Sequence, residues 1–275
     1  MAAERFPGLA GDRQAMREAV REAGAAVLAL FGGTVDAWTK ADSSPISEAD
    51  LAANRILKTH LIDRHGGGYG WLSEESTEEH GRLNAPRTWV IDPIDGTRAF
   101  LKGRPHFTIC AALIEDGDAI AAAVYNPATR EFFEAERGAG ATLNGTPIGA
   151  SSHDAVEDCA MLGAEHMFRH PGWPEDWPSM RIDQRNSTNY RMALIAKGEF
   201  DATLALARKA DWDAAPGALI AEEAGAIVSD HLGEKFTYNK PDPRQRSLVC
   251  TAPALYEHVL KRLAHLPPDF TSGSN

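Results

Sequence analysis

Acidic residues gather in four short segments that are far apart in the sequence. The densest of them is the run Asp92-Pro93-Ile94-Asp95-Gly96-Thr97. The other three are Glu74-Glu75, Trp212-Asp213 and the stretch from Ser47 to Asp50. Hard divalent cations such as Mg²⁺ prefer ligands that are all oxygen and mostly anionic. If folding brings these segments together, the chain has the ligands for a divalent metal site.

The local sequence around Asp92 explains how its carboxylate could be positioned. The apolar run Thr88 to Ile91 predicts a buried strand, and Asp92 follows directly at its end. Pro93 fixes its own φ and lacks an amide donor, which predicts a turn. The stretch from Thr97 to Gly103 predicts a short helix, whose first amides at Gly96 and Thr97 have no intrahelical acceptor and can bind phosphate.

Each acidic segment, taken alone, also fits an ordinary structural role. Asp95 could cap the following helix, and Glu74 with Glu75 could form a solvated surface pair. Asp213 could be a favourable acid in the first turn of a helix. The segment from Ser47 to Asp50 matches a capping box at the head of a helix that runs to about Asp63. The order and spacing of all four segments favour a shared metal site more strongly than any one segment does.

Three sequence stretches carry a family resemblance. They are SEES, which includes Glu74, then WVIDPIDGTRAF, and then DWDAAPGALIAEEAGA more than a hundred residues later. This series resembles the inositol monophosphatase superfamily of Mg²⁺-dependent, lithium-sensitive phosphatases, from about Asp12 to Leu263. The resemblance implies an α+β fold, a layered αβαβα sandwich, with the metal site between the two halves of the chain.

The resemblance also implies a set of metal ligands. Glu74, Asp92 and the carbonyl of Ile94 would hold a first Mg²⁺, and Asp92, Asp95 and Asp213 a second. Glu74 would help with a looser third ion, so each site would bind two or three. Two cations about 3.5 to 4 Å apart can stabilise both the attacking and the leaving oxygen of an in-line displacement. Acids packed so closely would repel one another without metal, so we expect a destabilised metal-free site.

Further roles are implied for residues around the phosphate. The amides of Gly96 and Thr97 would bind the phosphate, while Asp50 and the Thr97 hydroxyl would orient the attacking water. Asp50, Glu74 and Thr97 are therefore the predicted catalytic residues. Ser47 stands where the family usually has Thr, which keeps the hydroxyl.

Features of two phosphatase subfamilies are mixed in this sequence. The stretch from Phe100 to Phe107 and the helix from Ala218 to Ala226 resemble inositol monophosphatases. Arg98 and the segment Tyr238 to Pro241 (YNKP) resemble 3′(2′),5′-bisphosphate nucleotidases, and LALAR at 204–208 replaces the acid that inositol binding would require. A second phosphate needs a cation, and Arg98 and Arg208 are the predicted ones, with Lys102 and Lys209 as alternatives. These residues could equally be solvated surface charges.

The preferred interpretation is a bisphosphate nucleotidase that converts adenosine 3′,5′-bisphosphate to AMP and phosphate. Inositol-phosphate phosphatase is the alternative, followed by histidinol-phosphate or sugar-bisphosphate phosphatase on the same scaffold. A protein that binds phosphorylated ligands without catalysis is a further hypothesis of another class. Phosphate release with and without Mg²⁺ would separate it from the enzymes.

Composition limits the partners of the chain. Its 275 residues include 28 Lys and Arg against 39 Asp and Glu, giving a net charge of −11, which disfavours a nucleic-acid polymer. We expect a small phosphorylated metabolite as substrate and no membrane partner, and the resemblance allows a homodimer. The three cysteines, Cys110, Cys159 and Cys250, lie in apolar settings typical of buried thiols. With no secretory leader evident, we predict a cytoplasmic protein.

The pattern of elements predicts two subdomains, 1–150 and 151–275. The first would hold a long helix from Asp12 to Phe31, an antiparallel sheet and most metal ligands; the second would alternate strands and helices and complete the site. Gly66 to Gly68 predicts a loop, and 266–275 a frayed tail. The Trp- and Pro-rich segment 171–178 could be a lid, a dimer contact or an ordinary surface loop.

Overall fold

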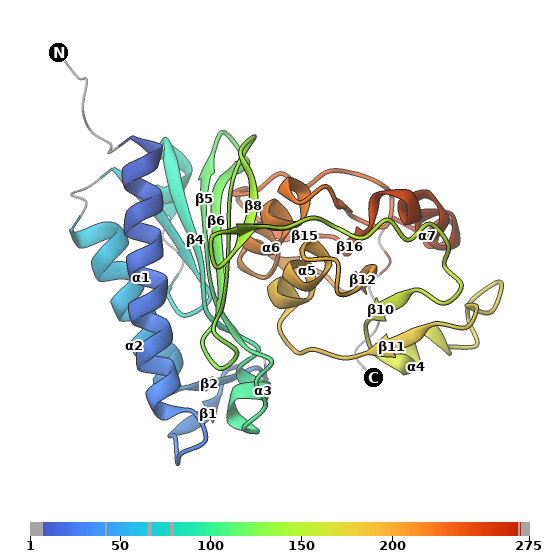
Figure 1. The fold of residues 1–275 in the computed structure, drawn as a ribbon. Coiled ribbons are helices and arrows are strands. Elements are labelled where there is room, and N and C mark those ends of the chain that lie inside the picture. The colour runs from blue at the N-terminus through green and yellow to red at the C-terminus, as the bar shows by residue number, and fades with distance from the viewer. Residues whose placement is uncertain (1–7, 42, 65–67, 78–79, 269, 271–275) are drawn as a thin grey trace.

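We describe a computed structural model of the chain, covering residues 8–41, 43–64, 68–77, 80–268 and 270. Part of the predicted 66–68 loop and most of the tail beyond Leu266 lie outside these residues. Five layers follow one another across the molecule, from the α1 side to the α7 side of Figure 1. This is the α+β αβαβα sandwich that the resemblance implied.

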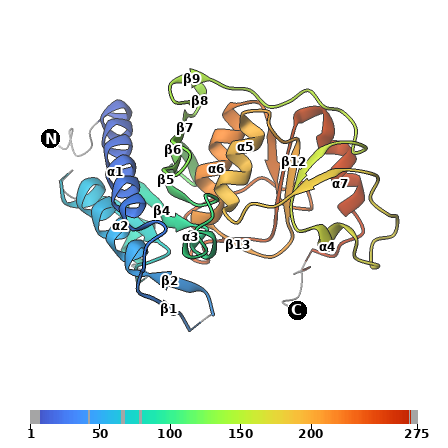
Figure 2. The same ribbon diagram turned by 60° about the horizontal axis from the view of Figure 1, so that its bottom comes forward.

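The first helical layer and the larger sheet lie in the N-terminal half. Helices α1 (Leu9–Leu30) and α2 (Glu48–Lys58) cover one face of a seven-stranded sheet (Figures 1 and 2). In spatial order its strands are β3 (Tyr69–Ser73), β4 (Arg87–Asp95), β5 (Thr108–Glu115), β6 (Asp118–Asn126), β7 (Glu131–Glu136), β8 (Gly140–Leu143) and β9 (Thr146–Pro147). Strands β4 to β9 form an antiparallel meander, and β3 pairs parallel to β4.

The second sheet and its helices complete the sandwich. Helices α5 (Thr188–Ala196) and α6 (Asp211–Glu223) lie between the two sheets. The five-stranded sheet has the order β11 (Arg181–Asp183), β10 (Ala160–Leu162), β12 (Ala202–Ala205), β16 (Leu248–Thr251) and β14 (Ile227–Ser229). Helices α4 (Glu165–Phe168) and α7 (Tyr256–Leu263) lie on its outer face.

Short elements connect these layers. A hairpin of β1 (Ala37–Thr39) and β2 (Pro45–Ser47) precedes α2, and β13 (Lys209–Ala210) pairs with β15 (Arg244–Gln245) just before α6. Helix α3 (Thr97–Leu101) follows β4. A π-helical turn η1 (Thr59–Asp63) extends α2, and η2 (His80–Asn84) and η3 (Pro253–Leu255) are 3₁₀ turns.

Hydrophobic burial explains the layering. One face of the larger sheet, including Trp89 and Ile91, packs on α1 and α2. Its other face, including Val90 and Ala112, joins α5, α6 and the second sheet in a common core. Because strand side chains alternate between faces, each central strand is apolar on both sides. The shared core links the two halves, and their division near Ala150 stays a prediction.

Two local predictions require correction. Strand β4 continues through Asp95 instead of stopping at Ile91, with a register shift between Asp92 and Asp95 opposite β5. An irregularity of this kind tolerates a proline, which cannot donate to the sheet. Helix α3 ends at Leu101, not Gly103, and Gly103 takes a φ of 65° that ends it. The strands that the sequence predicts at 107–114, 119–125 and 131–136 agree with β5, β6 and β7 to within one residue at each end.

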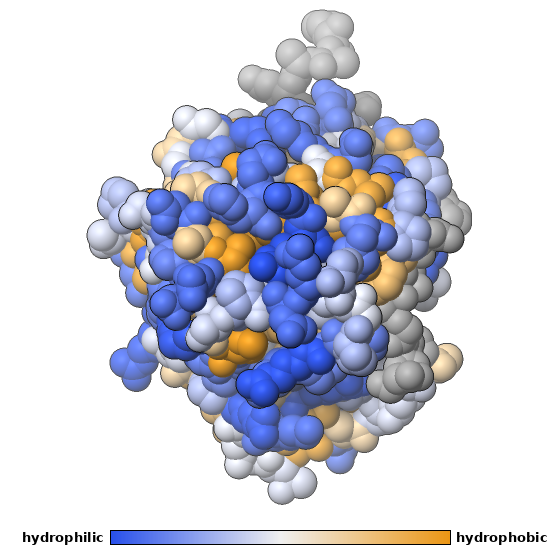
Figure 3. Space-filling view, turned by 90° about the vertical axis from the view of Figure 1, so that its right-hand side faces the viewer, coloured by the Kyte–Doolittle hydropathy of each residue, from blue (hydrophilic) through white to orange (hydrophobic). Residues whose placement is uncertain are grey.

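The face of the molecule on the α7 side is mostly hydrophilic (Figure 3). The face over α7 carries blue, polar residues with scattered apolar ones between them (Figure 3). All three cysteines are buried and free, as predicted. Among the described helices, none combines the length and the apolar character needed to cross a membrane.

Candidate metal and phosphate site

Three carboxylates from distant parts of the sequence meet at one point. Asp92, Asp95 and Asp213 each offer an oxygen, and these oxygens all lie within 4.8 Å of one another. Asp92 and Asp95 belong to β4, and Asp213 lies in the first turn of α6. The site therefore draws one ligand from the C-terminal half and two from the N-terminal half.

The irregularity in β4 lets both of its aspartates face this site. Residues three apart in a regular strand point to opposite faces of the sheet. In β4 the pairing with β5 shifts between Asp92, opposite Cys110, and Asp95, opposite Thr108. The Pro93-Ile94 dipeptide thus occupies the bulge and brings the two carboxylates together.

Asp92 has the most unfavourable environment of the three when no cation is bound. It is 1% exposed, and its Oδ1 has no hydrogen-bond partner among the described residues. Burial raises the pKa of Asp92 well above its usual value, and the negative charges of Glu74, Asp95 and Asp213 raise it further. A buried carboxylate oxygen without a partner is costly, and a divalent cation would satisfy it. The donor set therefore fits a metal ion that prefers oxygen.

Asp95 is held by the start of α5. Its Oδ2 accepts hydrogen bonds from Ser187 Oγ at 2.8 Å, Asn189 N at 2.7 Å and Asn189 Nδ2 at 3.0 Å, and its Oδ1 accepts from Thr188 N at 3.1 Å. Burial and the charge of Asp213 raise the pKa of Asp95 to about 6, although the hydrogen bonds oppose this. The amides at the helix start fix the carboxylate and favour its charged form.

Asn189 connects Asp95 to the helix that carries Asp213. Its Nδ2 also donates to Trp212 O at 2.9 Å, and its Oδ1 accepts from Gly217 N at 2.9 Å. Pro216, inside α6, has no amide to donate to the Trp212 carbonyl, so the asparagine supplies the missing donor. At Gly217 an added Cβ would lie 2.9 Å from Asn189 Cα, which explains the close approach of α5 and α6.

Sequence reasoning missed Ser187 and Asn189. The available signal was the polar run at 186–189 that precedes a predicted helix, because such residues cap helix starts. Ser187 is indeed the N-cap of α5, where its Oγ accepts from Tyr190 N. Which distant carboxylate these groups would contact was not readable from the sequence.

Asp50 and Thr97 lie side by side next to this cluster. Thr97 Oγ1 is 3.0 Å from both Asp50 Oδ1 and the Ile94 carbonyl oxygen, either of which can accept its proton. The Asp50 carboxylate also accepts from Ser47 N and Oγ at 2.8 and 2.5 Å, which completes the predicted capping box of α2. Burial raises the pKa of Asp50 against the lowering effect of these hydrogen bonds.

Gly96 joins β4 to α3 in a conformation that requires glycine. Its φ is 98°, and an added Cβ would lie 2.7 Å from the carbonyl oxygen of His106. Helix α3 begins at Thr97, so its first amides have no intrahelical acceptor. They stand beside the aspartate cluster, where an anion would meet both the amides and a bound cation.

Glu74 does not belong to the group of three carboxylates. Lys40 Nζ lies 2.8 Å from Glu74 Oε1 and 2.6 Å from Glu75 Oε1. Burial raises the pKa of Glu74 to about 7 despite Lys40, with further increases from the charges of Glu75 and Asp213. Glu74 therefore lies close enough to Asp213 for the two negative charges to repel each other. Lys40 was not among the residues singled out from the sequence.

The two arginines predicted to bind substrate lie on the surface. Arg98 is exposed on α3, next to Thr97. Arg208 is 41% exposed in its side chain and forms an ion pair with Asp242 at 2.7 Å. Lys209, one of the alternatives, acts on Asp95 electrostatically and lowers its pKa. Binding of substrate by Arg98 and Arg208 stays a prediction.

The YNKP segment has a structural role in this chain. Asn239 N donates to Asp211 Oδ2 at 2.7 Å, and its side chain contacts Arg82 and Thr88. Asp211 is the first residue of α6, and Tyr238 packs in the shared core. The segment thus fixes the start of the helix that carries Asp213, which explains its sequence without a bound nucleotide.

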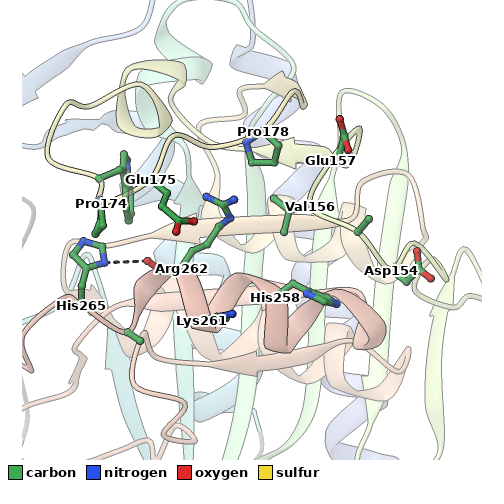
Figure 4. Close-up of a pocket in the computed structure, with 13 residues that line it drawn as sticks. Asp154, Val156, Glu157, Pro174, Glu175, Pro178, His258, Lys261, Arg262 and His265 are labelled. Carbon is green, nitrogen blue, oxygen red and sulfur yellow. Dashed lines mark hydrogen bonds between the residues drawn. The ribbon is translucent and has the colours of Figure 1, made fainter.

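A groove of about 750 Å³ lies away from the carboxylates, on the α7 side (Figure 4). It separates α7, which contributes His258, Lys261 and Arg262, from the Trp- and Pro-rich segment. Trp173 packs edge-on against Trp177, and Arg262 lies over the Trp177 ring at 5.2 Å. The segment is therefore anchored to α7 and the outer core, and it does not cover the metal ligands.

Together, the fold and the carboxylate cluster define a metal-dependent phosphoric monoester hydrolase. The model of the inositol monophosphatase family matches residues 12–266, and the chain belongs to this family. It is 35% identical to an inositol-1-monophosphatase of Rhizobium meliloti, over 90% of this chain and 92% of that protein. It is 31% identical to a histidinol-phosphatase of Chlorobaculum parvum, over 82% of this chain and 87% of that one.

A solved structure with a similar fold is the extragenic suppressor protein suhB from Bartonella henselae. The two share 26% sequence identity with a TM-score of 0.79, over 92% of this chain and 98% of the other. The agreement over nearly the whole chain confirms the sandwich architecture.

Proposed function

We propose that this chain hydrolyses an inositol monophosphate, using Mg²⁺ bound by Asp92, Asp95 and Asp213. The observation that carries the proposal is the meeting of these three carboxylates beside the Thr97–Asp50 pair and the α3 amides. Carboxylate oxygens suit Mg²⁺, and the ion would supply an activated water and neutralise charge on the phosphate. Glu74 and the Ile94 carbonyl are proposed as further ligands.

The protein groups orient the reactants around the phosphorus. The amides of Gly96 and Thr97 would donate hydrogen bonds to phosphate oxygens, whose negative charge is spread over all of them during transfer. The Thr97 hydroxyl, which donates to Asp50, would accept a hydrogen bond from the attacking water and so fix the direction of its attack. Burial keeps Asp50 and Thr97 away from bulk water, which strengthens these contacts.

Inositol monophosphate is better supported than adenosine 3′,5′-bisphosphate, the substrate that the sequence favoured. One relative is named an inositol-1-monophosphatase and another a histidinol-phosphatase, and neither name is a nucleotidase. Two of the sequence features that favoured a nucleotide also have local explanations, since Asn239 supports α6 and Arg208 pairs with Asp242. Histidinol phosphate is kept as a second candidate because of the relative's name.

Initial rates of phosphate release would rank these substrates. The assay compares inositol 1-phosphate, histidinol phosphate and adenosine 3′,5′-bisphosphate at equal concentration, with Mg²⁺ and with EDTA. The proposal expects the highest kcat/KM for inositol 1-phosphate and no turnover in EDTA. A preference of at least about tenfold, or 1.4 kcal/mol, for either other substrate would contradict it.

Three wider properties accompany this proposal. We infer inhibition by lithium and a homodimer from membership in the family, and a cytoplasmic location from the three free cysteines. Lithium titration, light scattering and fractionation would check them separately. None of the three is needed for the chemistry at Asp92 and Asp213.

A further inference from the structure

A buried hydroxyl of the larger sheet is connected to Asp95 through one other side chain. Thr108 of β5 is the residue that pairs with Asp95 of β4. Its Oγ1 lies 2.8 Å from the Oγ of Ser187, the N-cap residue of α5. The Ser187 hydroxyl in turn donates to Asp95 Oδ2 at 2.8 Å. Thr108 therefore reaches a proposed metal ligand by way of Ser187.

The protons and lone pairs of Ser187 fix the direction of these hydrogen bonds. A serine hydroxyl has one proton and two lone pairs, and an ionised carboxylate can only accept. The single Ser187 proton therefore goes to Asp95. Tyr190 N donates to the Ser187 oxygen at 2.9 Å and occupies one lone pair. The remaining lone pair accepts from Thr108, so the Thr108 hydroxyl is the donor in this pair.

Cys110 forms the far end of this chain of hydrogen bonds. Once the Thr108 hydroxyl donates to Ser187, its oxygen can only accept, and Cys110 Sγ lies 3.1 Å away. Alternate residues of a strand share a face, which places Thr108 and Cys110 on the same side of β5. Burial raises the pKa of the Cys110 thiol well above its usual value, so the sulfur keeps a proton to donate. Each proton in the chain then points toward Asp95.

The Thr108 contact also holds the start of α5 against the larger sheet. Four hydrogen bonds reach Asp95 from this helix start, and their donors are Ser187 Oγ, Thr188 N, Asn189 N and Asn189 Nδ2. The orientation of the carboxylate therefore depends on where α5 begins. Thr108 joins the N-cap of α5 to the strand that pairs with β4. Loss of its hydroxyl would leave this helix start less firmly placed beside Asp95.

Burial makes the Thr108 hydroxyl difficult to replace. Thr108 and Ser187 are both 0% exposed, so bulk water does not reach either oxygen. A buried acceptor that loses its donor keeps the cost of its desolvation. Without Thr108 as donor, Ser187 gains from moving toward another one, and such a movement alters its hydrogen bond to Asp95.

We propose that Thr108 is a positioning residue for Mg²⁺ binding, which acts through Ser187 to hold the Asp95 carboxylate in its metal-binding orientation. The group required at this position is a hydroxyl that donates a proton, and the methyl group of threonine is not required. The inference rests on the proposed Mg²⁺-dependent function, and it adds a residue outside the four acidic segments of the sequence.

Two substitutions at Thr108 separate the hydroxyl from packing. Thr108→Val keeps the shape and removes the donor, whereas Thr108→Ser keeps the donor and removes a methyl group. Calorimetric titration of the full chain with MgCl₂ measures the effect without substrate. Thr108→Val should weaken Mg²⁺ binding about three- to tenfold, less than loss of a direct partner of a metal ligand, and Thr108→Ser should stay within about twofold of wild type. Equal Mg²⁺ affinity of Thr108→Val and wild type would overturn the inference.

Thr203→Val is the matched control. Thr203 is 1% exposed in β12 of the second sheet, and its Oγ1 donates to Leu162 O at 2.8 Å. Both valine variants lose one buried hydrogen bond, and both should melt a few degrees below wild type. Only Thr108→Val should lose Mg²⁺ affinity. Similar losses of affinity in both variants would reveal a general effect of stability and contradict the role of Thr108. Should Thr108→Val not fold, Thr108→Ala against Thr108→Ser repeats the comparison.

A double-mutant cycle with Ser187→Ala tests whether Thr108 acts through Ser187. Thr108→Val should weaken Mg²⁺ binding in the wild-type background and have little further effect in Ser187→Ala. Equal effects in both backgrounds would mean that Thr108 acts by another route, and the chain of hydrogen bonds would be refuted. A wild type that binds no Mg²⁺ would overturn the proposed function, and the role of Thr108 with it. Failure of the Thr108 inference alone leaves wild-type Mg²⁺ binding intact, so the two failures are distinguishable.

Discussion

Asn189 donates two hydrogen bonds to one oxygen of Asp95, from its backbone at 2.7 Å and from its side chain at 3.0 Å. The same side chain bonds to Trp212 O and Gly217 N in α6. A single buried residue therefore sets the distance between the β4 aspartates and the helix that carries Asp213. The metal site depends on this contact between the two halves of the chain.

We expect Asn189→Ala to weaken Mg²⁺ binding by about ten- to a hundredfold and to lower kcat, the range typical when a group that orients a metal ligand is lost. It leaves Trp212 O without a donor and removes one hydrogen bond from Asp95. Titration calorimetry and initial rates measure the effect. Asn186→Ala, an exposed neighbour, is the matched control. Wild-type affinity in Asn189→Ala would show that Asp95 needs no such support.

Gly96→Ala should reduce both stability and activity. The substitution places a side chain at a φ of 98° and a Cβ 2.7 Å from the His106 carbonyl oxygen. Gly103→Ala tests the backbone cost alone, since its φ is 65° and nothing lies within 4 Å of an added Cβ. Strain at such an angle costs about 1–2 kcal/mol, and the close contact adds to it only at Gly96. Equal loss of melting temperature in both variants would contradict the close contact.

The stability of the metal-free protein should depend on pH in an unusual direction. The pKa values of Asp95 and Glu74 are raised to about 6 and about 7 in the folded state, so both groups bind protons more tightly folded than unfolded. The contribution of these two protonated groups to the free energy of unfolding is fully present below about pH 4 and is lost as pH rises through 6 to 7. Each group changes this free energy by up to about 1.4 kcal/mol per pH unit.

Melting temperatures in EDTA and in Mg²⁺ across pH 4 to 8 measure this effect. We expect the stabilisation by Mg²⁺ to increase with pH, because the metal binds the deprotonated acids. Asp95→Asn should reduce the pH dependence in EDTA. A Mg²⁺ effect that is the same at pH 5 and pH 8 would argue against a site built from these carboxylates.

Arg98→Ala and Arg208→Ala separate the two substrate classes. If Arg98 binds a second phosphate, its removal should raise KM for adenosine 3′,5′-bisphosphate about tenfold or more and change KM for inositol 1-phosphate little. Arg208→Ala should affect neither, because Arg208 pairs with Asp242 at the surface. Equal effects of Arg98→Ala on both substrates would remove the proposed second-phosphate role.

Much of the site was predictable because its groups lie in short, distinctive segments. The spacing within Asp92 to Thr97 predicted a strand, a break and a helix start, and the distant Asp213 was expected to join them. The bulge in β4 was not predictable, since proline usually ends a strand and nothing local showed that Asp95 would pair with Thr108. Long-range contacts such as Asn189–Asp95 and Lys40–Glu74 depend on how complete layers pack.

The central claim is that Asp213 shares a Mg²⁺ site with Asp92 and Asp95. The most direct measurement is Mg²⁺-dependent phosphate release from inositol 1-phosphate by wild type and Asp213→Asn, with Mg²⁺ binding measured on the same samples. Asp213→Asn should stay folded, bind Mg²⁺ more weakly, and lose at least about a hundredfold in kcat, as expected when an electrostatic group is removed. Near-normal turnover and Mg²⁺ affinity in folded Asp213→Asn would contradict the claim.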